Sequence, residues 1–256
     1  MVEKGLFAFR SLFVVLFVLG ACTHVPDLPP HKAGKGTGST QKETGFPICA
    51  PCTRDQAEGW EASAEKNAMS ALRAANCYAF LVGQEPNKAS KLADAKKGRE
   101  LAETAVKVLP KSGLTHYLYA YLTGLEAEND PLHGLELVSV IEREALLASD
   151  LNPAIDRGGP DRMLGELYLR APGIPVSIGD AEKAVAHYQR ALAIAPACPE
   201  NRMGLVEALL KEGDVEKACM HLHELLSDMP PARSLEVSWR KALGLLKQLC
   251  STKRSE

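Results

Sequence analysis

The apolar positions of this chain recur at helical spacing, and no segment alternates long enough between apolar and polar residues to predict a strand. Alanine and leucine dominate while aromatic residues make up only 5% of the chain, which favours helices over sheets. The clearest pattern lies in residues 158–196, where small and aromatic residues are spaced as in two packed antiparallel helices. The residues that carry this pattern are Leu164, Gly165, Tyr168, Ala184, Tyr188 and Pro196.

This spacing is the skeleton of a tetratricopeptide repeat, L-G-x2-Y followed by A-x3-aromatic and a closing proline. Small side chains let two helices approach closely, and the aromatic rings fill the space beside them. Prolines at positions 110, 153, 196 and 230 close successive units at spacings of 43, 43 and 34 residues, and 34 is the tetratricopeptide period. We therefore expect an all-α, tetratricopeptide-like helical-hairpin solenoid of about four helix pairs plus a C-terminal capping helix.

The pattern also predicts where the helices run. The first pair is expected at about 55–82 and 88–108, and the capping helix at about 234–250, which makes nine helices in all. Residues 171–180, with the sequence APGIPVSIGD, interrupt the third pair as an inserted loop.

The N-terminus predicts an exported, lipid-anchored protein. Lys4 and Arg10 precede a short apolar run, and small residues then lead to Cys22, as in a bacterial lipobox. We expect a signal peptide over 1–21, a flexible tether over 22–47 that begins at the lipidated Cys22, a helical domain over 48–250 and a disordered tail over 251–256. Thr23 after the cysteine resembles the sorting signal of outer-membrane lipoproteins in diderm bacteria, which favours that membrane, with the domain facing the periplasm.

Charge and motifs exclude several classes of function. The formal net charge is −2, and removal of the signal peptide leaves 28 basic and 31 acidic residues without a basic run, so nucleic acid is not an expected partner. The sequence has no GxSxG, HExxH or GxxxxGK motif and no metal-ligand spacing. We expect no enzymatic activity, no cofactor and no bound metal.

Six cysteines remain besides Cys22, and an oxidising compartment allows them to pair. If one helix starts near residue 55, Cys77 lies about 33 Å along it, whereas the lead-in from Cys49 reaches only about 20 Å. Cys49 and Cys52 are therefore expected to bond to each other or to another molecule, with redox and metal roles as the alternatives. Cys219 and Cys250 lie on adjacent antiparallel helices and are expected to pair, while Cys77 and Cys198 are expected to be buried thiols.

Two places in the sequence are candidates for binding. Arg157 and Arg162 flank a Gly-Gly-Pro turn before a helix, where they could dock an anionic group or pair with neighbouring aspartates to fasten the inserted loop. Asn76 interrupts an apolar stripe, so it is expected either to hydrogen-bond a neighbouring helix or to line a cavity.

The run GGPDRMLGELYLRAPGIPVSIGDAEKAVAHYQRALAIAP resembles the TatT family, lipoproteins of cryptic tetratricopeptide repeats associated with tripartite ATP-independent periplasmic (TRAP) transporters. The likeness extends over most of residues 55–230 and is sharpest in the inserted loop. The resemblance implies an all-helical body, allows a homotrimer with a central channel, and implies binding to the solute-binding component of the transporter. It points to Arg162, Tyr168, Pro172 and Pro175 as binding residues.

Together these patterns favour a lipid-anchored helical-repeat protein that binds a periplasmic partner, most specifically a TRAP solute-binding component. Two alternatives remain open. One is a general assembly scaffold of the cell envelope, and the other is a carrier of a small hydrophobic or carboxylate ligand.

Overall fold

The computed structural model describes residues 46–228 and 236–250, which form ten α-helices, one short 3₁₀ helix and no regular strand. In chain order these are α2 (Arg54–Glu61), α3 (Ala68–Gln84), α4 (Lys88–Val108), α5 (Gly113–Asn129), α6 (Gly134–Leu151), η1 (Ile155–Arg157), α7 (Gly159–Arg170), α8 (Ala181–Ile194), α9 (Pro199–Glu212), α10 (Val215–Asp228) and α11 (Glu236–Leu249).

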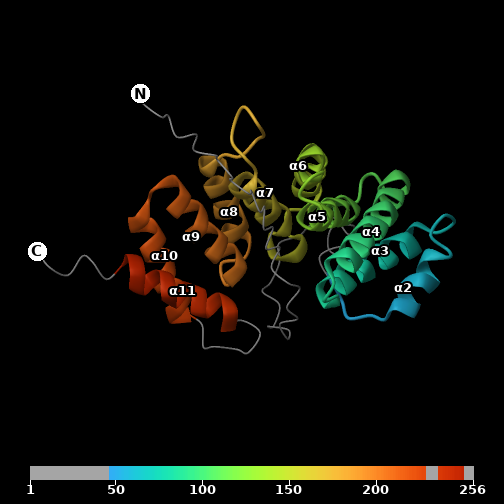
Figure 1. Cartoon of the computed structure of the whole chain (residues 1–256), viewed down its shortest axis with the longest axis horizontal. Coiled ribbons are helices and arrows are strands. Elements are labelled where there is room, and N and C mark those ends of the chain that lie inside the picture. The colour runs from blue at the N-terminus through green and yellow to red at the C-terminus, as the bar shows by residue number, and fades with distance from the viewer. Residues whose placement is uncertain (1–45, 229–235, 251–256) are drawn as a thin grey trace, which may run out of the picture.

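The helices stack as hairpins along one direction, from α2 at one end to α11 at the other (Figure 1). Each helix packs on the next one in the chain, and α3, α5, α7 and α9 also contact one another in succession. This arrangement is a tetratricopeptide-like solenoid with α11 as its cap, which is the predicted fold class.

Small residues set the helix spacing. The Tyr188 side chain of α8 is 1% exposed and lies between α7 and α9. A Cβ added at Gly165 would stand 2.7 Å from the Tyr188 ring, and one added at Gly204 would stand 2.0 Å from it. Both glycines are therefore required for the ring to fit between the two helices.

The prolines end helices where the pattern predicts. Helices α4, α6 and α8 end two residues before Pro110, Pro153 and Pro196, respectively. Proline cannot continue a helix because it lacks an N–H donor and its ring crowds the preceding turn. Pro230 lies outside the described residues.

The first predicted helix, 55–82, is wrong as a single element. The chain turns over residues 62–67, and Asn67 caps α3 by accepting a hydrogen bond from the Met69 N–H at 3.0 Å. As a result α2 folds back onto α3, where Ala57 is fully buried, and the described helices number ten rather than nine.

The same turn overturns the prediction for the N-terminal cysteines. Because α2 runs back along α3, Cys52 and Cys77 come within a Cα–Cα distance of 5.9 Å and form a disulfide. Cys52 is therefore not bonded to Cys49, and Cys77 is not a free buried thiol. The predicted separation of Cys77 from the N-terminal cysteines assumed one straight helix over 55–82, whereas the chain reverses between α2 and α3.

The other cysteines lie where the hairpin geometry puts them. Cys219 of α10 and Cys250, directly after α11, form a disulfide with a Cα–Cα distance of 5.8 Å. Cys198 has a free thiol and is 2% exposed.

The predicted signal peptide, lipidated Cys22, most of the tether and the tail lie outside the described residues. The last two tether residues belong to the folded body, since Phe46 packs against the core and the Pro47 carbonyl accepts a hydrogen bond from Asn76 at 3.0 Å. The helical domain therefore begins slightly before the predicted residue 48.

Candidate functional site

The connection between α7 and α8 is a closed, hydrogen-bonded loop that stands out from the stack (Figure 1). At its base the Asp180 N–H donates to the Tyr168 carbonyl at 2.9 Å, and the Gly179 N–H donates to the Pro172 carbonyl at 2.8 Å. Within the loop the Val176 N–H donates to the Gly173 carbonyl at 3.0 Å. These bonds give the insertion a defined shape.

The tip of this loop displays aliphatic side chains. Ile174 is 89% exposed and Val176 is 67% exposed, with Pro175 between them after a cis peptide bond. Isolated exposed apolar residues are common, but these two bulky ones lie two residues apart on a hydrogen-bonded loop, which makes the loop tip a candidate interaction site.

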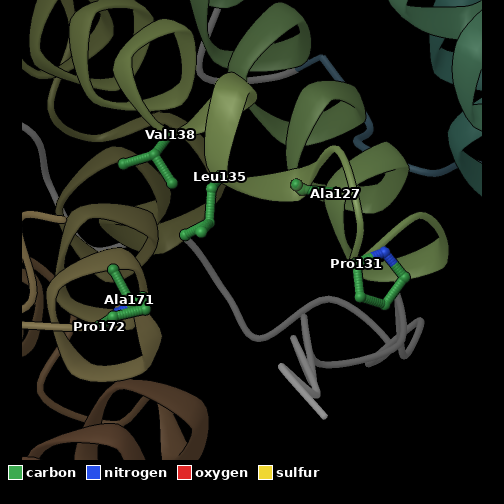
Figure 2. A pocket seen from close by; sticks show the side chains of 7 residues that line it. Ala127, Pro131, Leu135, Val138, Ala171 and Pro172 are labelled. Carbon is green, nitrogen blue, oxygen red and sulfur yellow. The ribbon is translucent and has the colours of Figure 1, made fainter. Parts of the chain in front are cut away.

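A second apolar region lies beside the loop, at the turn between α5 and α6. There Leu132 is 89% exposed and Leu135 is 46% exposed. Figure 2 shows that Leu135 and Val138 of α6 lie next to Ala171 and Pro172 at the end of α7.

These elements enclose a small apolar pocket of about 20 Å³, which has room for roughly one water molecule. The pocket is lined by Ala127, Pro131, Gly134, Leu135, Val138, Ala171 and Pro172. Leu132 follows the lining residue Pro131 directly in the chain, and Ile174 lies two residues after the lining residue Pro172. We call Leu132, Leu135, Pro172, Ile174 and Val176 the loop surface.

The segments that carry the loop surface are acidic. Residues 126–136 and 171–182 contain no lysine or arginine, and their acidic residues are Glu126, Glu128, Asp130, Glu136, Asp180 and Glu182. Burial raises the pKa of Glu128 to about 7. The positive charge of Lys91 lowers this pKa only in part, and the negative charge of Glu166 raises it further. A hydrogen bond from His133 keeps the pKa of Asp130 below its usual value.

The predicted anion site at the Gly-Gly-Pro turn is occupied from within the protein. The Arg162 guanidinium pairs with the Asp156 carboxylate and donates to the Asn201 side-chain oxygen at 3.0 Å. Asp156 and Arg157 have positive φ angles of 46° and 57°, and the Arg162 contacts hold this turn. Arg162 therefore pairs with a neighbouring aspartate, as one of its two predicted roles requires, but it fastens the turn before α7 and not the inserted loop over 171–180.

Arg157 lies at the same turn but faces outward. Its guanidinium approaches the Glu200 carboxylate at 3.6 Å and its side chain is 45% exposed. The Arg157 carbonyl accepts a hydrogen bond from Asn201 at 2.9 Å. Arg157 is not part of the loop surface, which is formed by the α5–α6 turn with the start of α6 and by the connection between α7 and α8.

Asn76 anchors the N-terminal segment. Its side-chain oxygen accepts from the Cys49 N–H at 2.8 Å, and its amide donates to the Pro47 carbonyl. Asn76 is 6% exposed and uses both ends of its amide, so it neither bridges to a neighbouring helix nor lines a binding cavity.

Tyr168 is also part of the interior. It is 4% exposed, its ring stacks on His187 with centroids 5.4 Å apart, and its hydroxyl donates to the Glu142 carboxylate at 2.5 Å. Of the four binding residues implied by the family resemblance, only Pro172 belongs to the loop surface, and Pro175 is exposed in the same loop between Ile174 and Val176.

The buried polar cluster under Tyr168 is arranged for structure. His187 and Arg190 both contact the Asp161 carboxylate, at 2.8 and 2.9 Å, and the Ser149 hydroxyl donates to Asp161 at 3.0 Å. The serine is thus bound to the aspartate and not to the histidine, which is the wrong order for a nucleophile activated by a base. Within the described ranges no three histidine, cysteine or acidic residues come close enough to hold a metal ion.

Sequence reasoning missed Leu132, Leu135, Ile174 and Val176. A signal for two of them was present, because Ile174 and Val176 fall among prolines and glycines where no helix can bury them. The approach of Leu135 to Pro172 has no signal in the sequence, since it depends on how α6 packs against α7.

The architecture is that of a helical-repeat scaffold of the tetratricopeptide class. Residues 178–234 match the tetratricopeptide repeat family. Among solved structures, a thermophilic TPR protein of Thermus thermophilus superimposes with a TM-score of 0.53 at 19% sequence identity, covering 73% of this chain and 88% of that one. No curated protein matches the sequence. None of the described helices combines the length and apolar character needed to cross a membrane.

Proposed function

We propose that this chain is a lipid-anchored protein of the bacterial periplasm that binds a partner protein without chemical catalysis. The observation that carries the proposal is the ordered loop on which Ile174 and Val176 are 89% and 67% exposed. A rigid helical stack that displays such a loop suits recognition, because little order has to be imposed when the partner binds. Tetratricopeptide-type repeats are in general scaffolds for protein–protein interaction.

The disulfides support export from the cytoplasm. Cys52–Cys77 and Cys219–Cys250 tie the two ends of the solenoid. Structural disulfides persist in oxidising compartments such as the periplasm. They agree with the lipobox at Cys22, whose acylation would hold the domain at a membrane, with the outer membrane favoured by Thr23.

The solute-binding component of a TRAP transporter is the specific partner that we propose. The support is the resemblance to the TatT family, which is sharpest in residues 171–180. That segment is also the one that presents Pro172, Pro175 and the exposed aliphatic side chains. The pocket of about 20 Å³ beside it is too small for a carried solute, which favours a protein partner over a small ligand.

Two experiments test this function. Cys22→Ser should move the full-length protein from the membrane fraction to the soluble periplasmic fraction and abolish incorporation of labelled palmitate, while Cys198→Ser should change neither. Retention of label in Cys22→Ser would refute the anchor.

The partner is tested by purifying the tagged, lipidated protein from detergent-solubilised membranes and identifying bound proteins by mass spectrometry, with an unrelated lipoprotein as control bait. Enrichment of a TRAP solute-binding protein is the expected result. Enrichment of outer-membrane assembly proteins instead would favour the scaffold alternative, and a retained small molecule in native mass spectrometry would favour the carrier.

A further inference from the structure

We infer that the loop surface docks a partner segment whose apolar ridge is flanked by lysine or arginine side chains. The inference rests on the proposed function and adds to it the place of contact and the chemistry of the partner.

The loop surface exposes apolar side chains on elements that are held in place by hydrogen bonds. Leu132 and Ile174 are each 89% exposed, and they lie one and two residues along the chain from Pro131 and Pro172, which line an apolar pocket. Leu135 sits on the first turn of α6, and the insertion is closed by its own hydrogen bonds. An apolar ridge could therefore bury these side chains without first ordering the loop.

The charged residues in the segments around those side chains are all acidic. Six acidic residues and no lysine or arginine lie in the two segments that form the surface. Among the described residues Glu136 and Glu182 are exposed and have no ion-pair partner, whereas Asp130 pairs with His133 and approaches Lys96. Two carboxylates thus remain available to a basic partner.

Two cations that border the insertion are engaged within the protein. Arg170 at the end of α7 is bound to Glu166 at 2.9 Å and Glu207 at 2.6 Å. Lys183 in the first turn of α8 lies over the Tyr168 ring at 5.1 Å. Of the six acidic residues, Glu126 pairs with Arg99 and Asp130 with Lys96 and His133, so within the described part of the chain Glu136 and Glu182 carry the exposed charge that has no ion pair.

The same charges disfavour a membrane as the occupant. Exposed aliphatic loops can insert into lipid, but anionic head groups attract lysine and arginine and repel carboxylates. A loop that served as a membrane contact would be expected to carry basic residues, and this one is flanked by Asp180 and Glu182.

Site-specific photo-crosslinking in the full-length, lipidated protein tests the inference directly. A photoreactive amino acid is placed at Ile174 or Leu132, with the exposed Gln189 on α8 as the control position, and the crosslinked peptides are sequenced. The expected result is a peptide of another protein that combines aliphatic residues with lysine or arginine, captured at Ile174 and Leu132 but not at Gln189. An acidic peptide, a peptide of this chain itself or a lipid adduct would overturn the inference.

The captured segment, made as a synthetic peptide, then serves as the probe for binding measurements. Ile174→Asp should weaken its Kd at least tenfold, whereas Ile194→Asp, a matched change at an exposed isoleucine on α8, should leave it unchanged. The double variant Glu136→Lys with Glu182→Lys should bind the peptide several-fold more weakly and with a smaller dependence on salt concentration. The control variant Glu65→Lys should change neither the affinity nor its salt dependence. Equal effects of the test and control variants would overturn the docking site.

The outcomes separate this inference from the proposed function. Crosslinks to a TRAP solute-binding protein from Gln189 but not from Ile174 would leave the proposed function standing and refute the docking site. Absence of any protein crosslink from all three positions, together with an empty pull-down, would refute both.

Discussion

The two ends of the solenoid reach the same helical-hairpin architecture by different means. In the repeats formed by α7 to α10, the helix spacing is set by close packing of the Tyr188 ring between Gly165 and Gly204. The hairpins formed by α2 to α6 lack that motif, and their closest helix approach lies at Gly98, whose added Cβ would stand 2.6 Å from a Leu122 methyl group. Disulfides and ion pairs occur in both halves, so the difference lies in which side chains are packed against the glycines. The comparison shows that a repeat can lose its sequence motif and keep its geometry when another small residue provides the close approach.

The links in the N-terminal half join different helices. The Cys52–Cys77 disulfide joins the start of α2 to α3, and Arg54 holds Asp94 of α4 through two hydrogen bonds of 2.8 Å. Deeper in the stack, His116 of α5 meets the Glu144 carboxylate of α6 at 2.6 Å, and both side chains are 5% exposed. These contacts connect residues that the sequence gives no reason to pair.

Removing the N-terminal disulfide should have the largest effect. The bond closes a separation of 25 residues, so Cys52→Ser combined with Cys77→Ser should destabilise α2 and α3 by about 3–4 kcal/mol. Hydrogen exchange followed by mass spectrometry should show lost protection in α2 and α3. The matched control is Cys219→Ser with Cys250→Ser, which closes a separation of 31 residues and should expose only α10 and α11. Unchanged exchange in α2 would show that the disulfide does not stabilise this hairpin.

Overpacking the motif repeats should be nearly as damaging. Gly204→Ala places a methyl group against the fully buried Tyr188 ring and should lower the free energy of unfolding by about 3 kcal/mol. Gly244→Ala, in the exposed middle of α11 with open space around its Cβ, should raise stability by about 0.5–1 kcal/mol. Urea unfolding measures both, and a stable Gly204→Ala protein would show that the ring does not set the spacing.

The His116–Glu144 pair should make the N-terminal half sensitive to pH. The hydrogen bond with Glu144 raises the pKa of His116 above 6.5 even though burial opposes it, and both ring nitrogens face acceptors because Nε2 lies 3.0 Å from the Pro110 carbonyl. The stabilisation from the protonated ring is therefore complete below pH 6.5 and is lost as the pH rises through the higher folded pKa.

Thermal unfolding tests this effect with His116→Gln. The variant should lose about 2 kcal/mol at pH 6 and much less at pH 9, with exchange rising in α5 and α6. His223→Gln, on the exposed side of α10, should behave like the parent at both pH values. A loss in His116→Gln that is the same at pH 6 and pH 9 would argue against a charged ring.

The smallest effect should come from Glu128. Its pKa of about 7 lies above the unfolded value near 4.5, so the folded protein binds the extra proton and loses stability as the pH rises from about 4.5 to 7. Glu128→Gln should raise the melting temperature slightly at pH 8 and leave it nearly unchanged at pH 4. Glu65→Gln is the exposed control, and a variant less stable than the parent at pH 8 would contradict the assignment.

Particular residues show how far the sequence alone could lead. Gly165, Tyr188 and the prolines at 110, 153 and 196 act locally, so the repeat architecture was predictable from their spacing. The break before Asn67 was not, because residues 62–66 are mostly good helix formers and the reversal is stabilised by packing between α2 and α3.

The candidate site was harder to predict than the fold. Arg162 and Asn76 hydrogen-bond Asn201 and Cys49, which lie 39 and 27 residues away, so the sequence predicted that they bond within the protein or bind a ligand but could not name these partners. Pro172 and Pro175 lie in the loop that the sequence pattern predicts over 171–180, whereas Leu132 comes from a different hairpin. Which apolar side chains remain uncovered is a property of the whole stack.

The insertion between α7 and α8 has a consequence for evolution. Hydrogen bonds to the Tyr168 and Pro172 carbonyls join its two ends at the base. Substitutions in residues 173–178 should therefore have little effect on the stability of the helices. Tip residues can therefore be exchanged, lengthened or shortened among descendants while the body keeps folding. Binding specificity can thus change through substitutions in the loop, while selection for folding acts on the helical stack.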